Sequence, residues 1–348
     1  MMDNNTTKKI ANTNKPKTRT TNTNKQSSVL EVGIDVGFGN VKIYTKHKGK
    51  EIKITFPSRF KKIDYETTDS IEINEDKYTF VEGDYIIENG HTSKDNKDTR
   101  VLLWKALNDI SLETNITEFN ICMNAALDSY KADNGRSIQD TMTEFKTIKI
   151  KERFKNEREI KINNLVCFPE CLVGGATVKK EQLNLREEEV IIIDFGNLNM
   201  QGIHVLYGSP NYKKSFATDY GMHHIYRRLA EQIKLVEPGI ATGAAVELYL
   251  KKTKEDSKYI ISEVDDVIMD FLIGSIFKEL DIELNMIKPS MYCKYLLTGG
   301  GSERMQRFLE TKFVEDKEKI FLEDGYYANA KGLYGKAKRI FNEKEGAK

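Results

Sequence analysis

The sequence predicts an α/β protein of two related domains, each a mixed sheet flanked by helices. A segment that contains an aspartate and two glycines, Val32–Lys42, is nearly repeated at Val190–Asn197. In both halves, strand-like segments are followed by helical segments and then by further strands, which is typical of α/β folds. The recurrence of this order indicates a duplicated architecture.

The first half begins with a β-meander. Alternating apolar residues predict strands at Val29–Val36 and Val41–Lys46, and a third at Glu51–Phe56. Residues 60–98 are polar with one weak hairpin, so we expect a small β-rich insertion in the first domain. The pattern then predicts a helix at Thr99–Leu112, a strand at Glu118–Ala125, a helix at about 135–146, strands at Thr147–Lys151 and Ile160–Phe168, and a helix at about 171–180.

The second half opens with the repeated hairpin. The elements predicted there are strands at 189–195 and 200–207, a helix that ends at Ile233, helices at Ala241–Lys251 and Glu263–Leu280, a strand at Tyr292–Leu297, a helix at Ser302–Phe313, a strand at Ile320–Leu322 and a helix at Ala328–Phe341. We therefore expect a first domain over 29–189 plus 327–348, and a second domain over 190–326.

Composition narrows the function classes. The chain has 348 residues and a net charge of +1, but residues 1–28 hold six basic groups against one aspartate and carry +5, which leaves −4 for the rest. We expect residues 1–28 to form a disordered basic tail, because they have almost nothing apolar to bury. The four cysteines show no disulfide or zinc spacing. We expect a soluble, cytoplasmic protein without a membrane segment.

The two hairpins are the first candidate sites. Asp35 and Asp194 each end a mostly apolar strand, where a carboxylate needs a cation or hydrogen-bond donors. Mg²⁺ held through water by one or two carboxylates and by substrate phosphates satisfies that need. The glycines beside them allow backbone N–H groups to approach a ligand closely. The pair predicts a clamp on the phosphates and metal of a nucleotide, although each aspartate alone could simply cap its turn.

Two further stretches fall between a strand and a helix. Thr298–Gly301 would expose backbone N–H groups at a helix N-terminus, which suits a nucleotide. Glu170 follows the strand that ends at Phe168, and a glutamate there can orient a water for attack on a γ-phosphate. The spacing excludes two familiar motifs, because Lys42 stands where a dinucleotide fingerprint needs its third glycine and no P-loop motif occurs.

Taken together, these motifs resemble a known superfamily. Asp35–Lys42, Asp194–Asn197, Leu297–Gly301 and Ala328–Leu333 occur with the order and spacing of the actin, heat-shock chaperone and sugar-kinase ATPases. Within that superfamily the chain is most similar to bacterial actin-like plasmid-segregation ATPases of the ParM type. Asn40–Lys42, Phe56–Arg59 and Phe168–Glu170 carry this closer resemblance, which spans residues 30–340.

The resemblance implies an actin-like fold around a nucleotide cleft, with ATP or GTP and Mg²⁺ between the hairpins. Asp35 and Asp194 would hold the hydrated metal, Glu170 would position the lytic water, and Lys42 would reach the phosphates. The second hairpin departs from the family pattern, since Leu198 replaces a glycine in its turn. The implied nucleotide-binding residues are Gly37, Phe38, Gly39, Asn40, Lys42, Gly196, Asn197, Asn199, Gly299, Gly300 and Gly301, and Glu170, Asp194 and Asp35 are the implied catalytic residues.

The function implied is a cytoskeletal ATPase that polymerises with nucleotide and drives plasmid partition. Its expected partners are other copies of itself and a DNA-binding adaptor of the ParR type, which would make plasmid DNA an indirect partner. Two alternatives remain open at this point. A sugar-type kinase of the same superfamily would need a catalytic base for a hydroxyl group, for which the sequence shows no clear candidate. A membrane-associated cell-shape actin homologue would need an amphipathic end, for which the final helix is the candidate.

Overall fold

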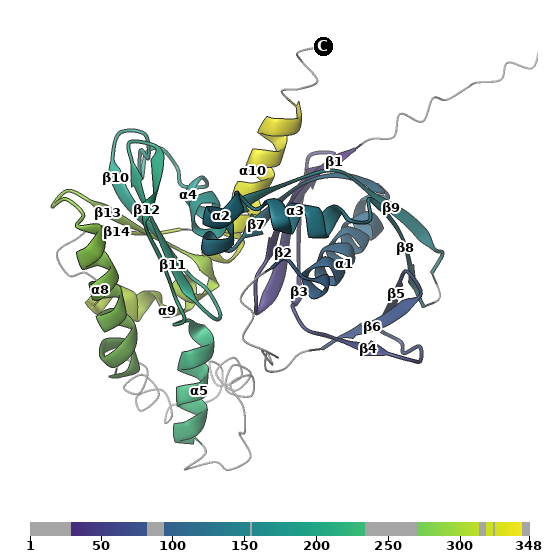
Figure 1. The fold of residues 1–348 in the computed structure, drawn as a ribbon, viewed down its shortest axis with the longest axis horizontal. Helices are drawn as coiled ribbons and strands as arrows, with labels where there is room; N and C mark the ends of the chain where they lie inside the picture. The colour runs from purple at the N-terminus through teal and green to yellow at the C-terminus, as the bar shows by residue number, and fades with distance from the viewer. Residues whose placement is uncertain are drawn as a thin grey trace, which may run out of the picture.

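The computed structural model shows two lobes, each built on one sheet, with the helix α10 between them (Figure 1). The structure describes residues 29–81, 94–153, 155–233, 270–312, 318–322 and 324–342. The expected tail, the expected helix at 241–251 and the first part of the expected helix at 263–280 lie outside these residues.

The first lobe contains a nine-stranded sheet in the order β3-β2-β1-β7-β9-β8-β5-β6-β4. β1 runs antiparallel to β2 and parallel to β7, which in turn runs parallel to β9. The expected β-rich insertion therefore continues the same sheet, through the antiparallel pair of β5 and β8. The strands are β1 (Leu30–Val36), β2 (Asn40–His47), β3 (Lys50–Pro57), β4 (Phe60–Ile63), β5 (Ser70–Ile73), β6 (Asp76–Phe80), β7 (Glu118–Ala125), β8 (Thr147–Glu152) and β9 (Arg158–Pro169).

The second lobe contains a five-stranded sheet in the order β12-β11-β10-β13-β14. Its centre repeats that of the first sheet, because β10 pairs antiparallel with the next strand along the chain and parallel with β13. This repetition confirms the duplicated mixed-sheet architecture. The strands are β10 (Glu189–Phe195), β11 (Met200–Leu206), β12 (Ser209–Thr218), β13 (Lys294–Thr298) and β14 (Lys319–Phe321).

Helices flank both sheets. They are α1 (Lys97–Thr114), α2 (Leu127–Asp133), α3 (Arg136–Thr143), α4 (Glu170–Gly175), α5 (Met222–Ile233), the π-helix η1 (Leu272–Phe277), α8 (Lys278–Ile287), α9 (Gly299–Lys312), the 3₁₀ turn η2 (Gly325–Tyr327) and α10 (Ala328–Asn342). The sequence did not predict α2, β4 or β12. The helix expected to reach about residue 180 already ends at Gly175, as two adjacent glycines favour helix termination. The glycine run that was expected before α9 forms its first turn.

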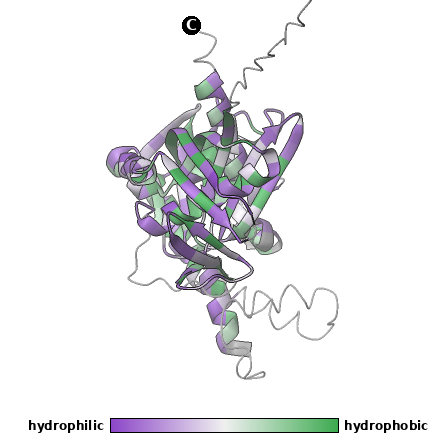
Figure 2. Cartoon of the chain, turned by 90° about the vertical axis from the view of Figure 1, so that its right-hand side faces the viewer, coloured by the Kyte–Doolittle hydropathy of each residue, from purple (hydrophilic) through white to green (hydrophobic). Residues whose placement is uncertain are grey.

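No helix in the described ranges is long and apolar enough to span a membrane. Figure 2 shows hydrophobic residues along the central strands, and hydrophilic residues mixed with them on the helices.

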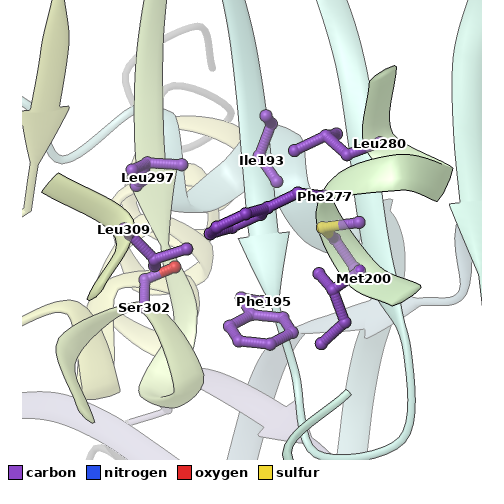
Figure 3. Close-up of a pocket in the computed structure, with 9 residues that line it drawn as sticks. Ile193, Phe195, Met200, Phe277, Leu280, Leu297, Ser302 and Leu309 are labelled. Carbon is purple, nitrogen blue, oxygen red and sulfur yellow. The ribbon is translucent and has the colours of Figure 1, made fainter. Parts of the chain in front are cut away.

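The sheet of the second lobe is buried on both faces. Along β10, Ile191, Ile193 and Phe195 pack against α5, α8 and α9, while Val190 and Ile192 pack on the opposite face near α4. This alternation follows from the two-residue period of a strand. Figure 3 shows a small pocket in the first of these layers, whose lining residues are Ile193, Phe195, Met200, Ile276, Phe277, Leu280, Leu297, Ser302 and Leu309. Its lining is apolar apart from one serine hydroxyl, which donates to the Thr298 carbonyl at 2.6 Å.

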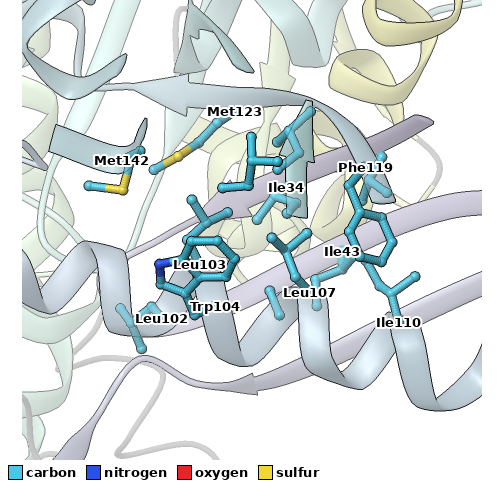
Figure 4. Packing of buried hydrophobic residues seen from close by; sticks show 14 of the residues in the cluster. Ile34, Ile43, Leu102, Leu103, Trp104, Leu107, Ile110, Phe119, Met123 and Met142 are labelled. Carbon is cyan, nitrogen blue, oxygen red and sulfur yellow. The ribbon is translucent and has the colours of Figure 1, made fainter. Parts of the chain in front are cut away.

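The sheet of the first lobe is covered by α1 and α3 on one face and by α10 on the other. Figure 4 shows the first layer, where Leu103, Trp104 and Leu107 of α1 pack against β-strand residues such as Ile34 and Phe119. On the opposite face, Cys122 of β7 packs with apolar residues of α10, which are Leu333, Ala337 and Phe341.

All four cysteines are buried and free, as their apolar sequence contexts indicate. Burial raises the pKa of the Cys122 thiol to about 12. The described residues contain no group of three or more His, Cys, Asp or Glu side chains suited to hold a metal.

The two lobes meet where α10 crosses α4. Gly332 of α10 packs so tightly on α4 that a Cβ atom there would overlap the backbone carbonyl of Val173. A Cβ atom added to Gly335, one turn further along α10, would have no neighbouring atom within 4 Å. The contact at Gly332 therefore sets the spacing between these two helices.

This contact predicts opposite effects for two substitutions in one helix. Gly332→Ala should lower the free energy of unfolding by about 2 kcal/mol, because a rigid carbonyl must move to admit the methyl group. Gly335→Ala should raise it by roughly 0.5–1 kcal/mol, since alanine favours an exposed helix interior. Urea unfolding monitored by circular dichroism measures both values. A Gly332→Ala protein as stable as the wild type would contradict the close packing of α4 and α10.

Candidate functional site

The first hairpin places Asp35 at the end of β1, where the carboxylate is only 3% exposed. Its turn is closed by a hydrogen bond from the Gly37 N–H to the Asn40 carbonyl at 3.2 Å. Ser58, just after β3, holds the same turn from outside. Its hydroxyl donates to the Gly37 carbonyl at 2.5 Å and its N–H donates to the Gly39 carbonyl at 3.1 Å. The turn is therefore fixed in shape, as a preorganised ligand-binding loop must be.

The second hairpin repeats this geometry. Asp194 lies near the end of β10 and is 7% exposed, and the Gly196 N–H donates to the Asn199 carbonyl at 2.9 Å. The turn also holds the start of α5, because the His223 N–H donates to the Asn197 carbonyl at 2.7 Å. Leu198, which replaces the glycine of the family pattern, is buried. The substitution thus leaves the closure of the turn intact.

The two turns come into contact. A Cβ atom on Gly39 would lie 3.1 Å from Cγ of Asn197, which leaves little space between them. Asp35 also acts electrostatically on Asp194, whose pKa is raised by burial first and then by the Asp35 charge, while a hydrogen bond from Asn329 opposes the rise. The structure therefore brings together the two carboxylates that the sequence pointed to.

Lys42 joins this site from β2. Its Nζ lies 3.1 Å from Asp35 Oδ2 and 4.9 Å from the ring centroid of Tyr326. Burial disfavours the charged ammonium, but Asp35, Tyr326 and Asp194 together raise the pKa of Lys42 above its usual value. The lysine is therefore charged and held beside Asp35 and Tyr326.

Glu170 is the centre of the hydrogen-bond network. It is the first residue of α4 and is 8% exposed. Its Oε1 accepts a hydrogen bond from Asn124 at 2.6 Å and forms an ion pair with Lys94. Its Oε2 accepts a hydrogen bond from Gln201 at 2.6 Å. Donors on both sheets and from the segment before α1 thus orient this carboxylate.

The two carboxamides that hold Glu170 are themselves anchored. The Asn124 Nδ2 also donates to Asp35 Oδ1 at 2.6 Å, and its Oδ1 accepts from the Val36 N–H at 2.8 Å. The Gln201 Oε1 accepts from the Leu127 N–H at 3.1 Å. Asp35 and Glu170 are therefore coupled through one side chain.

Asp194 has its own partner in α10, since the Asn329 Nδ2 donates to Asp194 Oδ2 at 2.6 Å. Gly299 lies against the same carboxylate with φ +88°, a conformation that favours glycine, and a Cβ atom there would overlap Asp194 Oδ1. The next two glycines also face side chains or backbone of the protein. A Cβ atom added to Gly300 would lie 2.9 Å from the ring of Tyr326, and Gly301 lies against Phe195.

We define the interdomain polar cluster as Asp35, Lys42, Lys94, Asn124, Glu170, Asp194, Gln201 and Asn329. Lys94, Asn124 and Gln201 were missed in the sequence because nothing in their local segments marks them. Asn329 was also not singled out, although it lies within the Ala328–Leu333 segment that carried the family resemblance. That segment could have identified it as a candidate site residue. Two buried oxygens of the described site, Thr298 Oγ1 and Asn329 Oδ1, lack a hydrogen-bond partner.

The donor set fits a magnesium nucleotide. Two carboxylates that act on each other match the one or two carboxylates through which proteins hold a hydrated Mg²⁺ together with phosphates. Lys42 supplies positive charge for phosphate, and the two turns present backbone. The buried oxygens without partners are additional acceptors for water or ligand donors.

Comparison with known proteins gives a consistent result. Residues 33–172 match the family described as actin like proteins N terminal domain. The archaeal actin homologue Ta0583 has 20% identity and a TM-score of 0.70, over 89% of this chain and 100% of its own. Its complex with ADP has 19% identity and a TM-score of 0.66 over the same shares of the two chains. A ParM filament from Clostridium botulinum has 17% identity and a TM-score of 0.65, over 90% of this chain and 99% of its own. No curated protein matches the sequence.

The network predicts that Asn124 stabilises the fold. Asn124→Ala should lower the free energy of unfolding by about 3 kcal/mol, because two buried carboxylates and one backbone N–H lose a partner. Asn120→Ala is the matched control on the same strand, since its side chain accepts a single exposed hydrogen bond. The control should change stability by less than about 0.5 kcal/mol. Equal effects of the two substitutions in chemical denaturation would show that the network contributes nothing.

Proposed function

We propose that this chain, which has an actin-like fold, is a cytoplasmic ATPase that polymerises with nucleotide and segregates plasmid DNA. The observation that carries the proposal is the pair of contacting turns, each beside a buried carboxylate, with Lys42 paired to Asp35 and Glu170 linked to Asp35 through Asn124. The crystal structure of Ta0583 with ADP supports a nucleotide as the ligand.

In this proposal, the chain's own residues bind and orient the reactants. Backbone N–H groups within the turns Gly37–Asn40 and Gly196–Asn199, other than those of Gly37 and Gly196 that close the turns, would bind the phosphates, together with Lys42. Asp35 and Asp194 would hold the hydrated Mg²⁺, which supplies charge neutralisation at the phosphates when bound. Gly299–Gly301 would lie against the adenosine, at the start of α9.

Glu170 would accept a hydrogen bond from the attacking water. A water-orienting carboxylate must keep one orientation, and donors from both sheets hold Glu170 in this way. The hydrolysis that results would destabilise the filament and so act as a timer for its disassembly.

Filament formation is supported by the relatives. Similar solved structures include a ParM filament from Clostridium botulinum and the filament of AlfA from a B. subtilis plasmid. We propose that this chain self-associates in the same general way. A DNA-bound adaptor of the ParR type would connect the filament to the plasmid.

The cell-shape alternative loses its main candidate. An amphipathic membrane anchor needs a free apolar face, but the apolar residues of α10 pack against the first sheet and α4. The sugar-kinase alternative would need a base for a hydroxyl group. ATP turnover that rises with added sugars, without a pelletable polymer, would favour it.

The test of the proposal is negative-stain electron microscopy of the purified chain. We expect filaments with Mg-ATP or with a non-hydrolysable analogue, and none without nucleotide. Asp194→Ala should abolish assembly or raise the critical concentration at least about tenfold, since one of the two metal-side carboxylates is lost. Asp140→Ala, which removes an exposed aspartate of α3, is the control and should assemble normally. Absence of filaments from the wild-type protein under all three conditions would rule out the proposed function.

Glu170→Ala separates assembly from hydrolysis. The variant should still form filaments, but phosphate release should slow by roughly 100-fold, as expected when a residue that orients the attacking water is lost. Its filaments should therefore persist longer after dilution. Glu159→Ala, an exposed position on the strand that leads to Glu170, is the control. A wild-type rate of phosphate release from Glu170→Ala filaments would remove this residue from the reaction.

A further inference from the structure

Lys94 is a buried lysine that none of the motifs explains. It lies just before α1, and its side chain is 3% exposed. Its ammonium forms an ion pair with Glu170 and lies 5.6 Å from the ring centroid of Phe38, in the turn of the first hairpin. Asp35, Asp194 and Lys42 all act on it electrostatically. Lys94 thus belongs to the interdomain polar cluster through Glu170.

A buried ammonium requires a reason. Removing a lysine from water is unfavourable unless a carboxylate compensates, and burial lowers the pKa of Lys94 to about 8 although Asp35 opposes the fall. An apolar residue of similar length would avoid this loss. A structural ion pair is often no more stabilising than its apolar replacement, so stability alone does not account for the charge.

The three donors to Glu170 differ in how firmly they are held. Asn124 and Gln201 are each anchored by a second hydrogen bond, from the N–H of Val36 and of Leu127. The ammonium of Lys94 is carried on a flexible four-carbon chain and has three donors that can turn to a new acceptor. Among these three donors, Lys94 is therefore the one that can leave Glu170 without breaking the network that holds the two sheets.

We propose that Lys94 is a second phosphate-binding lysine, which pairs with Glu170 while no nucleotide is bound and moves to the terminal phosphate of a bound nucleoside triphosphate. The inference rests on the proposed function, because it takes the polar cluster as the nucleotide site. The move frees one lone pair of Glu170 Oε1 for the attacking water, while Asn124 still donates to the same oxygen.

The proposal also gives a means of telling triphosphate from diphosphate. Among the described residues, the cluster contains three carboxylates and two ammonium groups. The carboxylates belong to Asp35, Glu170 and Asp194, and the ammonium groups to Lys42 and Lys94. A triphosphate adds a terminal group that can compete with Glu170 for Lys94. A diphosphate lacks that group, so Lys94 returns to Glu170 after phosphate release.

The experiment compares affinities for two nucleotides. Binding of Mg-ADP and of a non-hydrolysable ATP analogue to the full-length chain is measured by titration calorimetry below the polymerisation threshold. Lys94→Met should weaken binding of the analogue by 10- to 100-fold, as expected for the loss of one charge-assisted contact, and binding of ADP by less than about threefold. Lys97→Met, an exposed lysine three residues along the chain, is the control and should change neither affinity.

A second variant guards against misfolding. Lys94→Gln keeps a hydrogen-bond donor for Glu170 but no charge, and it should lose the same preference for the triphosphate. If both variants keep the wild-type ratio of the two affinities, the proposal is wrong and the lysine has a structural role. Damage to the fold would weaken the binding of both nucleotides to the same extent and so leave that ratio unchanged. If the wild-type protein binds neither nucleotide, the proposed function itself fails.

Discussion

The carboxylate of Glu170 is held simultaneously from both sheets, by Asn124 of β7 and Gln201 of β11. Because each oxygen accepts a bond of 2.6 Å from a different lobe, a change in the relative position of the sheets must lengthen at least one of them. Asn124 extends the coupling to Asp35, so the first hairpin moves with it. A change in the relative position of the two lobes therefore changes the geometry of the polar cluster.

Charge explains why the cluster is built this way. Buried carboxylates are stable only with cations or donors nearby, and Asp35 has both Lys42 and Asn124. Asp194 has the Asn329 carboxamide instead, and burial raises its pKa. Its need for a cation is thus less fully met by the protein than that of Asp35. A metal ion on the side of Asp194 would correct this asymmetry.

The sequence predicted what is local and missed what is assembled from distant segments. The hairpins at Asp35 and Asp194 were found because strand, carboxylate and glycine turn are contiguous, and the fold followed from their repetition. β12 was missed because its sequence, SPNYKKSFAT, is an edge strand with little apolar alternation. Asn124 and Gln201 end up beside Glu170 only through the pairing of strands, so no spacing in the chain reveals them. The predicted domain boundaries and the roles of the site residues remain predictions.

We expect the two contacting turns to bind the phosphates of a nucleotide. A crystal structure of the chain with Mg²⁺ and a non-hydrolysable ATP analogue tests this most directly. Phosphate oxygens should lie within hydrogen-bonding distance of backbone N–H groups in both Gly37–Asn40 and Gly196–Asn199, with the metal on the side of Asp35 and Asp194. An analogue bound away from these turns, or contacting only one of them, would contradict this expectation.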